Sequence, residues 1–380
     1  MRYRKLGNTD LLVSEIGIGC THIPTIDEKS LKEIIDKGLD VGINFLDICL
    51  SGLEVRDRVG RVLEGRRDKF IILGHLGYTL EGGQEARTQE LEKSVLHMND
   101  LFARLKTDYI DVAMLHCIDS LEEYENAVKN GLIDYMLQQK EKGIFKYIGF
   151  SSHMTDVSTI MVKSGYFDVV MFSVCPLFDF VFSDMYKWFE MGENDAYPKG
   201  MSIDKSRADF YALCQEKGVS IVAMKALAAG GLVTTAGSPF AKSLTVPQCI
   251  HYALNRPAVD SVFIGFDKAA QIDDAIQYYN STAEELDYSD VLNSVTGELT
   301  KRCLYCNHCL PCPSQINIGI LTKLLDTGVL NGKTESLQAE YDKLDKKASD
   351  CIECGVCIKR CPFGIDIVEN MRKANEIFDT

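Results

Sequence analysis

Residues 14–49 read SEIGIGCTHIPTIDEKSLKEIIDKGLDVGINFLDIC and contain two apolar runs on either side of an amphipathic stretch. The runs at 14–20 and 43–49 are rich in Ile, Leu and Phe, which is typical of buried strands. The stretch at 28–40 repeats its apolar residues at helical spacing, as one buried face of a helix requires. The sequence therefore predicts a strand–helix–strand unit, the building block of a parallel sheet.

The same alternation continues to about residue 280, and a second clear helical stretch spans residues 87–105. Eight such units favour an α/β fold, a closed (β/α)8 TIM barrel, over the alternative of an open doubly wound sheet. The remaining predicted strands lie in KFIILGHLG (69–77), DYIDVAMLHC (108–117), YIGFSSH (147–153), DVVMFSVCP (168–176), VSIVAMKAL (219–227) and DSVFIGF (260–266).

Charge and hydropathy exclude several classes of partner. The chain has 41 Lys and Arg against 55 Asp and Glu, a net charge of −14. Such an acidic chain gains nothing from phosphate contacts and is repelled by anionic lipid, so we expect binding to neither nucleic acid nor membrane. The N-terminus has no apolar core typical of a signal peptide, and no apolar stretch reaches membrane-spanning length. These features predict a cytoplasmic protein.

The cysteines divide the chain into two parts. Six of the 14 are scattered through the first 250 residues, and eight lie in two groups after residue 300. Clustered thiols in a reducing compartment indicate metal binding. We therefore predict a barrel over residues 1–290 and a small C-terminal α-helical, ferredoxin-like domain over 291–380. The aromatic-rich stretch 177–204 between strands is either a substrate wall above the barrel or a contact with the C-terminal domain.

The second cysteine group follows the C-x2-C-x2-C-x3-C-P run of bacterial ferredoxins, and the first differs by one residue in its last gap. In two-cluster ferredoxins the fourth cysteine of each run binds the other cluster. Structural zinc is the alternative, but it gives no reason for three closely spaced thiolates, twice, each run ending in Cys-Pro. We assign one 4Fe–4S cluster to Cys303, Cys306, Cys309 and Cys361, and the other to Cys351, Cys354, Cys357 and Cys312.

Two neighbouring clusters form a relay for single electrons. Such a relay is useful where a two-electron reaction exchanges with a ferredoxin- or flavodoxin-type partner, so we expect redox chemistry in the barrel. The alternative is that the clusters only stabilise their domain.

Several segments resemble the aldo-keto reductase superfamily: RKLGNTDLLVSEIGIGC (4–20), GINFLDIC (42–49), DYIDVAMLHC (108–117) and IGFSSH (148–153). The whole chain resembles the branch with a C-terminal ferredoxin-like domain. The resemblance implies NADPH-dependent carbonyl reduction by an Asp, Tyr, Lys and His set. Asp47 and His116 match that set, but Gly52 stands at the tyrosine position and His75 at the lysine position. The usual proton donor is therefore missing.

The resemblance also implies a dinucleotide site at the ends of the strands. Two of its usual contacts are replaced here, by Met171 and Gln271, so NAD(P)H or a flavin is an open expectation and a preference for the 2′-phosphate form is not expected. The predicted cofactor-binding residues are Ser151, Ser152, Lys225, Gly230, Gly231 and Lys268.

The predicted strand ends gather cysteines and histidines at one face of the barrel, where barrel enzymes place their chemistry. Cys20, Cys49 and Cys175 beside imidazoles suggest a further metal or cluster, although buried cysteines commonly act as small apolar fillers. His75 or His153 is the preferred replacement general acid, because imidazole titrates near neutral pH. The predicted catalytic residues are Asp47, His75, His116 and His153.

Three functions fit this pattern. The first is an iron–sulfur oxidoreductase that passes electrons through both clusters to or from a small organic substrate at the barrel mouth, with or without a nicotinamide or flavin. The second is an electron-transfer or partner-binding protein whose barrel has lost catalysis. The third is a conventional NAD(P)H-dependent carbonyl reductase that recruits another tyrosine, such as Tyr78.

Overall fold

The structure is a computed structural model that describes most of the chain in two compact units. The barrel unit holds the described residues of Met1–Thr79, Arg87–Asp184 and Tyr197–Gly297, and the cluster unit holds Leu80–Ala86 and those of Glu298–Thr380. The predicted division at residues 290 and 291 stays a prediction. The described residues are 1–20, 22–49, 52–181, 203–234, 238, 240–292, 294, 303, 307–361 and 365–379.

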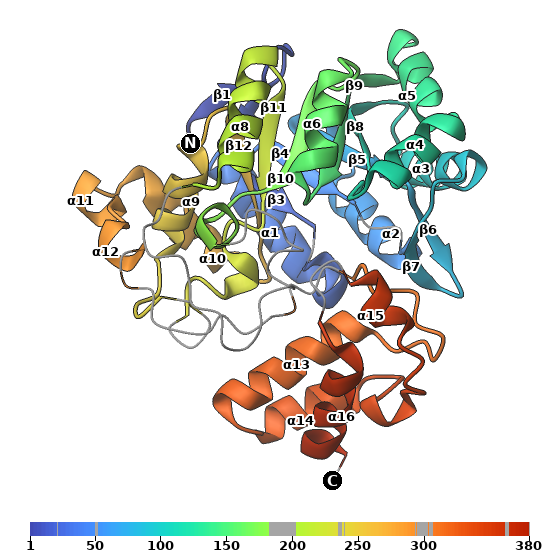
Figure 1. Ribbon diagram of the computed structural model, residues 1–380, viewed down its shortest axis with the longest axis vertical. Coiled ribbons are helices and arrows are strands. Elements are labelled where there is room, and N and C mark those ends of the chain that lie inside the picture. Colours follow the sequence, from blue (N-terminus) through green and yellow to red (C-terminus); the bar gives the residue numbers. More distant parts are fainter. Residues whose placement is uncertain are drawn as a thin grey trace. The chain divides into compact units, whose positions relative to one another are not determined.

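Eight parallel strands close into a barrel, which confirms the predicted fold (Figure 1). Strands that follow one another in the chain are neighbours, apart from two short hairpins that stand outside the barrel. Every predicted apolar run contributes one strand. The barrel strands are β3 (Ile16–Gly19), β4 (Phe45–Ile48), β5 (Ile71–Leu76), β8 (Ile110–Leu115), β9 (Phe145–Ser152), β10 (Val169–Ser173), β11 (Ser220–Met224) and β12 (Val259–Gly265).

Helices follow the strands and surround the barrel (Figure 1). The first begins after Asp27, whose side chain accepts from the backbone N–H of Ser30 and caps the helix. The helices of this unit are α1 (Glu28–Asp40), α2 (Leu53–Val62), α3 (Leu91–Leu105), α4 (Leu121–Lys129), α5 (Leu132–Glu141), α6 (Thr155–Lys163), α8 (Lys205–Lys217), α9 (Val246–Leu254), α10 (Ala270–Ile276), α11 (Ala283–Leu286) and α12 (Ser289–Leu292).

The predicted helix over 87–105 begins four residues late. Gln84–Arg87 forms strand β7, which pairs with β6 (Tyr78–Glu81) in a hairpin, and α3 begins only at Leu91. Arg87, the last residue of β7, is the one hairpin residue that the predicted helix includes; the mixed polar sequence of the hairpin has no clear strand periodicity, and no strand was predicted there.

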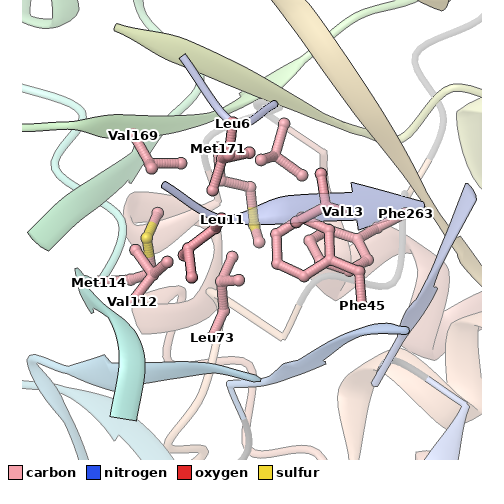
Figure 2. Close-up of a cluster of buried hydrophobic side chains, with 11 residues drawn as sticks. Leu6, Leu11, Val13, Phe45, Leu73, Val112, Met114, Val169, Met171 and Phe263 are labelled. Atoms are coloured by element: carbon pink, nitrogen blue, oxygen red, sulfur yellow. The ribbon is translucent and has the colours of Figure 1, made fainter. Parts of the chain in front are cut away.

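A cluster of buried side chains fills the interior at the N-terminal ends of the strands (Figure 2). Phe45 and Val169, the first residues of β4 and β10, belong to this cluster. Leu6, Leu11 and Val13 join it from the N-terminal hairpin of β1 (Tyr3–Lys5) and β2 (Leu12–Ser14). The barrel is therefore a packed core at this end, and chemistry is confined to the opposite end of the strands.

Apart from the hairpin residues Leu80–Ala86, the described part of the cluster unit consists of helices and loops. Helix α13 (Ile318–Asn331) contacts α16 (Ile367–Phe378), with α14 (Glu335–Asp342) and α15 (Val356–Arg360) completing the unit. The rings of Tyr341 and Phe378 stack with centroids 4.5 Å apart, and the Tyr341 hydroxyl accepts from the backbone N–H of Ala348. These contacts hold the ends of the domain together.

Two predictions depend on segments that the structure covers only in part. The predicted substrate wall at 177–204 lies mostly outside the described residues, which show a short π-helix at Leu177–Val181 and resume at residue 203. Within the described part of the chain, the helices are all too short or too polar to span a bilayer.

Candidate functional site

The strand periodicity brings three predicted catalytic residues into the barrel interior. Side chains two positions apart on a strand share a face. Asp47 follows Phe45 by two residues, His75 follows Leu73 and His116 follows Met114, and the earlier member of each pair lies in the interior cluster. The three polar side chains therefore form the next interior layer, toward the C-terminal ends of β4, β5 and β8.

These side chains form a continuous hydrogen-bonded chain. Nε2 of His75 lies 2.9 Å from Oδ1 of Asp47, and Nδ1 of His75 lies 3.0 Å from Nδ1 of His116. A carboxylate only accepts, so the Nε2–H of His75 donates to Asp47 and its Nδ1 accepts from the Nδ1–H of His116. This tautomer leaves Nε2 of His116 as a proton acceptor at the end of the chain.

Burial differs along the chain in a way that suits proton transfer. Asp47 and His75 are buried, whereas His116 is only half-buried and lies edge-on to Tyr78, with ring centroids 4.4 Å apart. Burial, followed by the neighbouring His75, lowers the pKa of His116 well below its ordinary value of 6.5. His116 is therefore a neutral imidazole at neutral pH.

The thiols of Cys20 and Cys49 lie at the other end of this chain. The Cys20 thiol donates to Oδ2 of Asp47 over 3.2 Å, and the sulfur atoms of Cys20 and Cys49 are 2.8 Å apart. Asp47 and the two cysteines form one group of metal-ligand type. Cys175, predicted with them, is fully buried and is not in that group as far as the described residues extend. Burial raises the pKa of the Cys175 thiol to about 12, as expected for an apolar filler.

His153 belongs to a second chain. Its Nδ1 lies 2.9 Å from Oδ2 of Asp119, and its Nε2 lies 2.6 Å from Nζ of Lys225. The ammonium donates to Nε2 and the Nδ1–H donates to the carboxylate, which fixes a neutral imidazole. Burial lowers the pKa of His153 from its ordinary value in agreement with this assignment. Of the four predicted catalytic residues, Asp47 and His116 therefore contact His75 directly. His153 does not.

Several predicted cofactor residues already have partners within the barrel. The Ser151 hydroxyl accepts from the backbone N–H of Cys117 over 2.7 Å, and the Ser152 hydroxyl donates to Oδ1 of Asp119 over 3.1 Å. Lys225 contacts His153 as described. Lys268 follows β12 and is exposed.

The loop after β11 has the left-handed backbone that anion-binding loops use. Gly230 has a φ of +87°, and a Cβ atom at this position would meet no neighbour within 4 Å. Ala228 and Ala229 also have positive φ, whereas Gly231 does not. The backbone N–H groups of Ala228, Gly230 and Gly231 donate to carbonyls within the turn, so they are already used. The predicted nucleotide site at this loop therefore stays a prediction.

Four of the cluster cysteines line one cavity. These are Cys312 from the first run and Cys351, Cys354 and Cys357 from the second, the set assigned to a single 4Fe–4S cluster. The remaining lining is mostly apolar, including Ile316, Ile367 and Met371. A four-thiolate donor set in an apolar surround suits a 4Fe–4S cluster.

The loop that carries Cys312 is held from both sides. The Gln84 side chain accepts from the backbone N–H of Cys312 over 2.7 Å and donates to the carbonyl of Ile316 over 3.1 Å. Nη1 of Arg360 donates to the carbonyl of Pro311 over 2.8 Å. These bonds order the ligand loop independently of any bound group.

The other predicted ligand set is described only in part. Cys309 is buried, Cys303 and Cys361 are partly buried, and Cys306 lies outside the described residues. This assignment stays a prediction.

Sequence reasoning missed Asp119 and Gln84. Asp119 follows His116 by three residues at the end of a barrel strand, where acidic residues are candidates for function, and this position was a usable signal. Gln84 had no signal, because nothing in the local sequence indicates that Leu80–Ala86 belongs to the cluster unit.

An eight-stranded parallel barrel with polar and ionisable groups at one end, together with a four-cysteine cavity, defines an iron–sulfur oxidoreductase. Residues 15–188 match the aldo/keto reductase family, and residues 302–366 match the 4Fe-4S dicluster domain. The chain thus has a region that matches the aldo/keto reductase family, followed by a C-terminal 4Fe-4S dicluster domain, and it is an oxidoreductase.

Curated relatives and solved structures agree with this assignment. The uncharacterized oxidoreductase YqkF of Bacillus subtilis (strain 168) is 28% identical over 307 residues, which cover 75% of this chain and 94% of the relative. L-galactose dehydrogenase of Arabidopsis thaliana is 23% identical over 306 residues, 72% and 86% of the two chains. The holo form of aldo-keto reductase AKR11C1 from Bacillus halodurans superposes with a TM-score of 0.61 at 23% identity, over 80% and 99% of the chains, and shares the fold.

Proposed function

We propose that this protein catalyses the reversible oxidation of a hydroxyl to a carbonyl group on a small organic substrate at the barrel mouth, and exchanges the electrons with its clusters. The observation that carries the proposal is the Asp47–His75–His116 chain, with links of 2.9 and 3.0 Å. This chain supplies a neutral imidazole base that is hydrogen-bonded, through His75, to a buried carboxylate. Such a base is needed because Gly52 stands at the position of the family's tyrosine.

The residues of the chain have separate parts in the proton transfer. Nε2 of His116 accepts the hydroxyl proton while its Nδ1–H moves toward His75. Asp47 stabilises the resulting imidazolium, as the buried carboxylate of a catalytic triad does. The reverse sequence protonates a carbonyl oxygen. His116 is thus the catalytic base and acid, and His75 and Asp47 position and polarise it.

The oxidation also releases two electrons and a proton from the carbon, and this second proton passes to solvent water. Each 4Fe–4S cluster exchanges one electron when bound, so two clusters match one substrate. A nicotinamide or flavin accepting a hydride is the alternative route, and the loop leaves space for it beside Gly230, where a Cβ atom would meet no neighbour within 4 Å. A ferredoxin- or flavodoxin-type protein is the outer electron partner in this proposal.

Lys225 gives the substrate a second point of attachment. Its ammonium is half-buried and donates to the neutral His153. We assign this cation to an anionic or strongly polar group of the substrate or cofactor, because a charged donor makes a stronger hydrogen bond than a neutral one.

The experiment is an anaerobic assay of the holoprotein with oxidised methyl viologen as acceptor and a panel of small polyols. L-galactose is included because one relative is named for it. His116→Ala should lower turnover by about 10²–10⁴-fold, the range of general acid–base catalysis. His251→Ala, on the outer helix α9, is the matched control and should leave it unchanged. Equal rates for the His116→Ala variant and the wild type would remove His116 from the mechanism.

Two observations favour other functions. Tyr78 lies against His116, as a carbonyl reductase with a recruited tyrosine would require. The internal partners of Ser151 and Ser152 favour a barrel without a nucleotide. Titration with NADH, NADPH and FMN separates them: tight NADPH binding favours the reductase, and absence of both binding and turnover favours an electron-transfer protein.

A further inference from the structure

Cys20 and Cys49 lie close together at the barrel mouth because the strands that precede them are neighbours. Cys20 follows β3 and Cys49 follows β4, and these strands are parallel neighbours with Ile18 opposite Leu46. Cys20 is two positions beyond Ile18 and Cys49 is three positions beyond Leu46, so the two residues differ by one position in register at the ends of these strands. Neighbouring strands are about 4.8 Å apart, which is within the Cα separation of a disulfide.

The contacts of the two thiols point to chemistry between them. Their sulfur atoms are 2.8 Å apart, and the Cys20 sulfur also accepts from the backbone N–H of Cys49 over 3.4 Å. Two thiolates on one tetrahedral zinc, with bonds of ~2.3 Å, have sulfur atoms about 3.8 Å apart. The observed separation is too short for shared ligation and needs less than an ångström of movement to reach a bond of about 2.05 Å.

We propose that Cys20 and Cys49 form a reversible dithiol–disulfide couple next to the catalytic carboxylate. The couple is separate from the 4Fe–4S ligands and does not depend on the identity of the substrate. Its oxidant is a low-molecular-weight disulfide.

The exposure of the two residues sets the order of events. Cys49 is partly exposed, whereas Cys20 is 1% exposed. The Cys49 thiolate attacks the small disulfide and releases one small thiolate. The Cys20 sulfur then attacks the Cys49 sulfur and releases the second small thiolate. The Cys20 proton passes by way of Oδ2 of Asp47, 3.2 Å away, to that departing thiolate. Two thiols are oxidised to one disulfide, and the small disulfide is reduced to two thiols.

This reaction would also change the catalytic chain. The Cys20 thiol donates to Oδ2 of Asp47 while Oδ1 accepts from His75. A disulfide sulfur has no proton to donate, so Asp47 loses one of its two described side-chain donors. The couple thereby links thiol redox state to the carboxylate that supports His75.

The test uses anaerobically purified holoprotein incubated with defined ratios of reduced and oxidised glutathione, then alkylated and digested with trypsin. Cys20 and Cys49 fall in separate tryptic peptides, residues 6–29 and 38–56, and neither peptide has another cysteine. The wild type should yield these two peptides joined by a disulfide that dithiothreitol reverses. Iron content measured in parallel shows that the clusters are intact.

Single variants test the order. Cys20→Ser should leave Cys49 as a stable mixed disulfide with glutathione, and Cys49→Ser should leave Cys20 unmodified, with the joined peptides at least tenfold less abundant in both. Cys214→Ser, which removes a fully buried helix cysteine, should behave as the wild type. Failure to recover joined peptides at any glutathione ratio, or zinc retained by the wild type and lost in both variants, would overturn the proposal.

Discussion

His75 and His153 are both clamped by a carboxylate at the end of a barrel strand, yet their second contacts differ. His75 meets another imidazole, that of half-buried His116, whereas His153 meets the ammonium of Lys225. An imidazole can take and return a proton near neutral pH, while a lysine ammonium holds its proton. The Asp47–His75–His116 chain therefore suits proton transfer, whereas the Asp119–His153–Lys225 chain keeps the lysine ammonium in a fixed position.

The largest effect is expected when the carboxylate of the first chain, Asp47, is replaced. Asp47→Asn keeps the volume but removes the charge that stabilises a protonated His75. We expect turnover to fall by about 10²-fold or more, with little change in KM, because the loss appears only when the proton moves. Steady-state kinetics with methyl viologen give the measurement. A purely structural Asp47 would instead raise KM or lower the melting temperature without this kcat effect.

The pH profile distinguishes a histidine base from a tyrosine acid. The pKa of His116 is held well below 6.5 by burial, so it stays neutral at pH values where an exposed histidine is protonated. In the oxidation direction kcat/KM should stay level from about pH 8 down to 6.5 and fall by about tenfold per unit only below the lowered pKa. A profile that rises steadily toward pH 10 would point to a phenol in place of His116.

Replacing the cation of the second chain should affect binding more than chemistry. Lys225→Met removes a charge-assisted donor, and a loss of about 1.5 kcal/mol corresponds to a rise in KM of roughly tenfold with kcat nearly unchanged. Lys225→Arg, which keeps the charge, is the matched control. A drop in kcat equal to that of Asp47→Asn would erase the distinction between the two chains.

The smallest effect is expected at Tyr78. Its ring lies edge-on to His116, with centroids 4.4 Å apart, and Tyr78→Phe keeps this contact while removing the hydroxyl. Turnover should stay within about threefold of the wild type, because His116 carries the proton. A loss of several hundredfold would favour the carbonyl reductase and make Tyr78 the proton donor.

The sequence predicted the barrel well because each buried strand is a compact apolar run that needs no distant information. The resemblance to the aldo-keto reductases placed Asp47, His75 and His116 at the barrel mouth, and the structure agrees, since each follows an interior residue by two positions. The sequence could not predict that His75 contacts His116 while His153 contacts Lys225. Those contacts depend on the register of neighbouring strands and on the loop after β11.

The same limit explains why the hairpin at Tyr78–Arg87 was not predicted. Its strands are short and mixed in polarity, and one of its main contacts lies more than 200 residues away in the chain, between Gln84 and Cys312. In contrast, three of the four predicted ligands in the set of Cys351, Cys354, Cys357 and Cys312 lie in one short stretch of sequence. Cys312 was assigned to the set only by analogy with two-cluster ferredoxins.

The Gln84 contact has a consequence for how the molecule can be divided. A fragment cut at the start of the cysteine-rich region would lack the side chain that fixes the Cys312 loop, so neither genetic truncation nor proteolysis in the connecting segment would release an intact C-terminal module. During synthesis the hairpin leaves the ribosome long before the cysteines do. The earlier part of the polypeptide thus carries a template onto which the later ligand loop can fold.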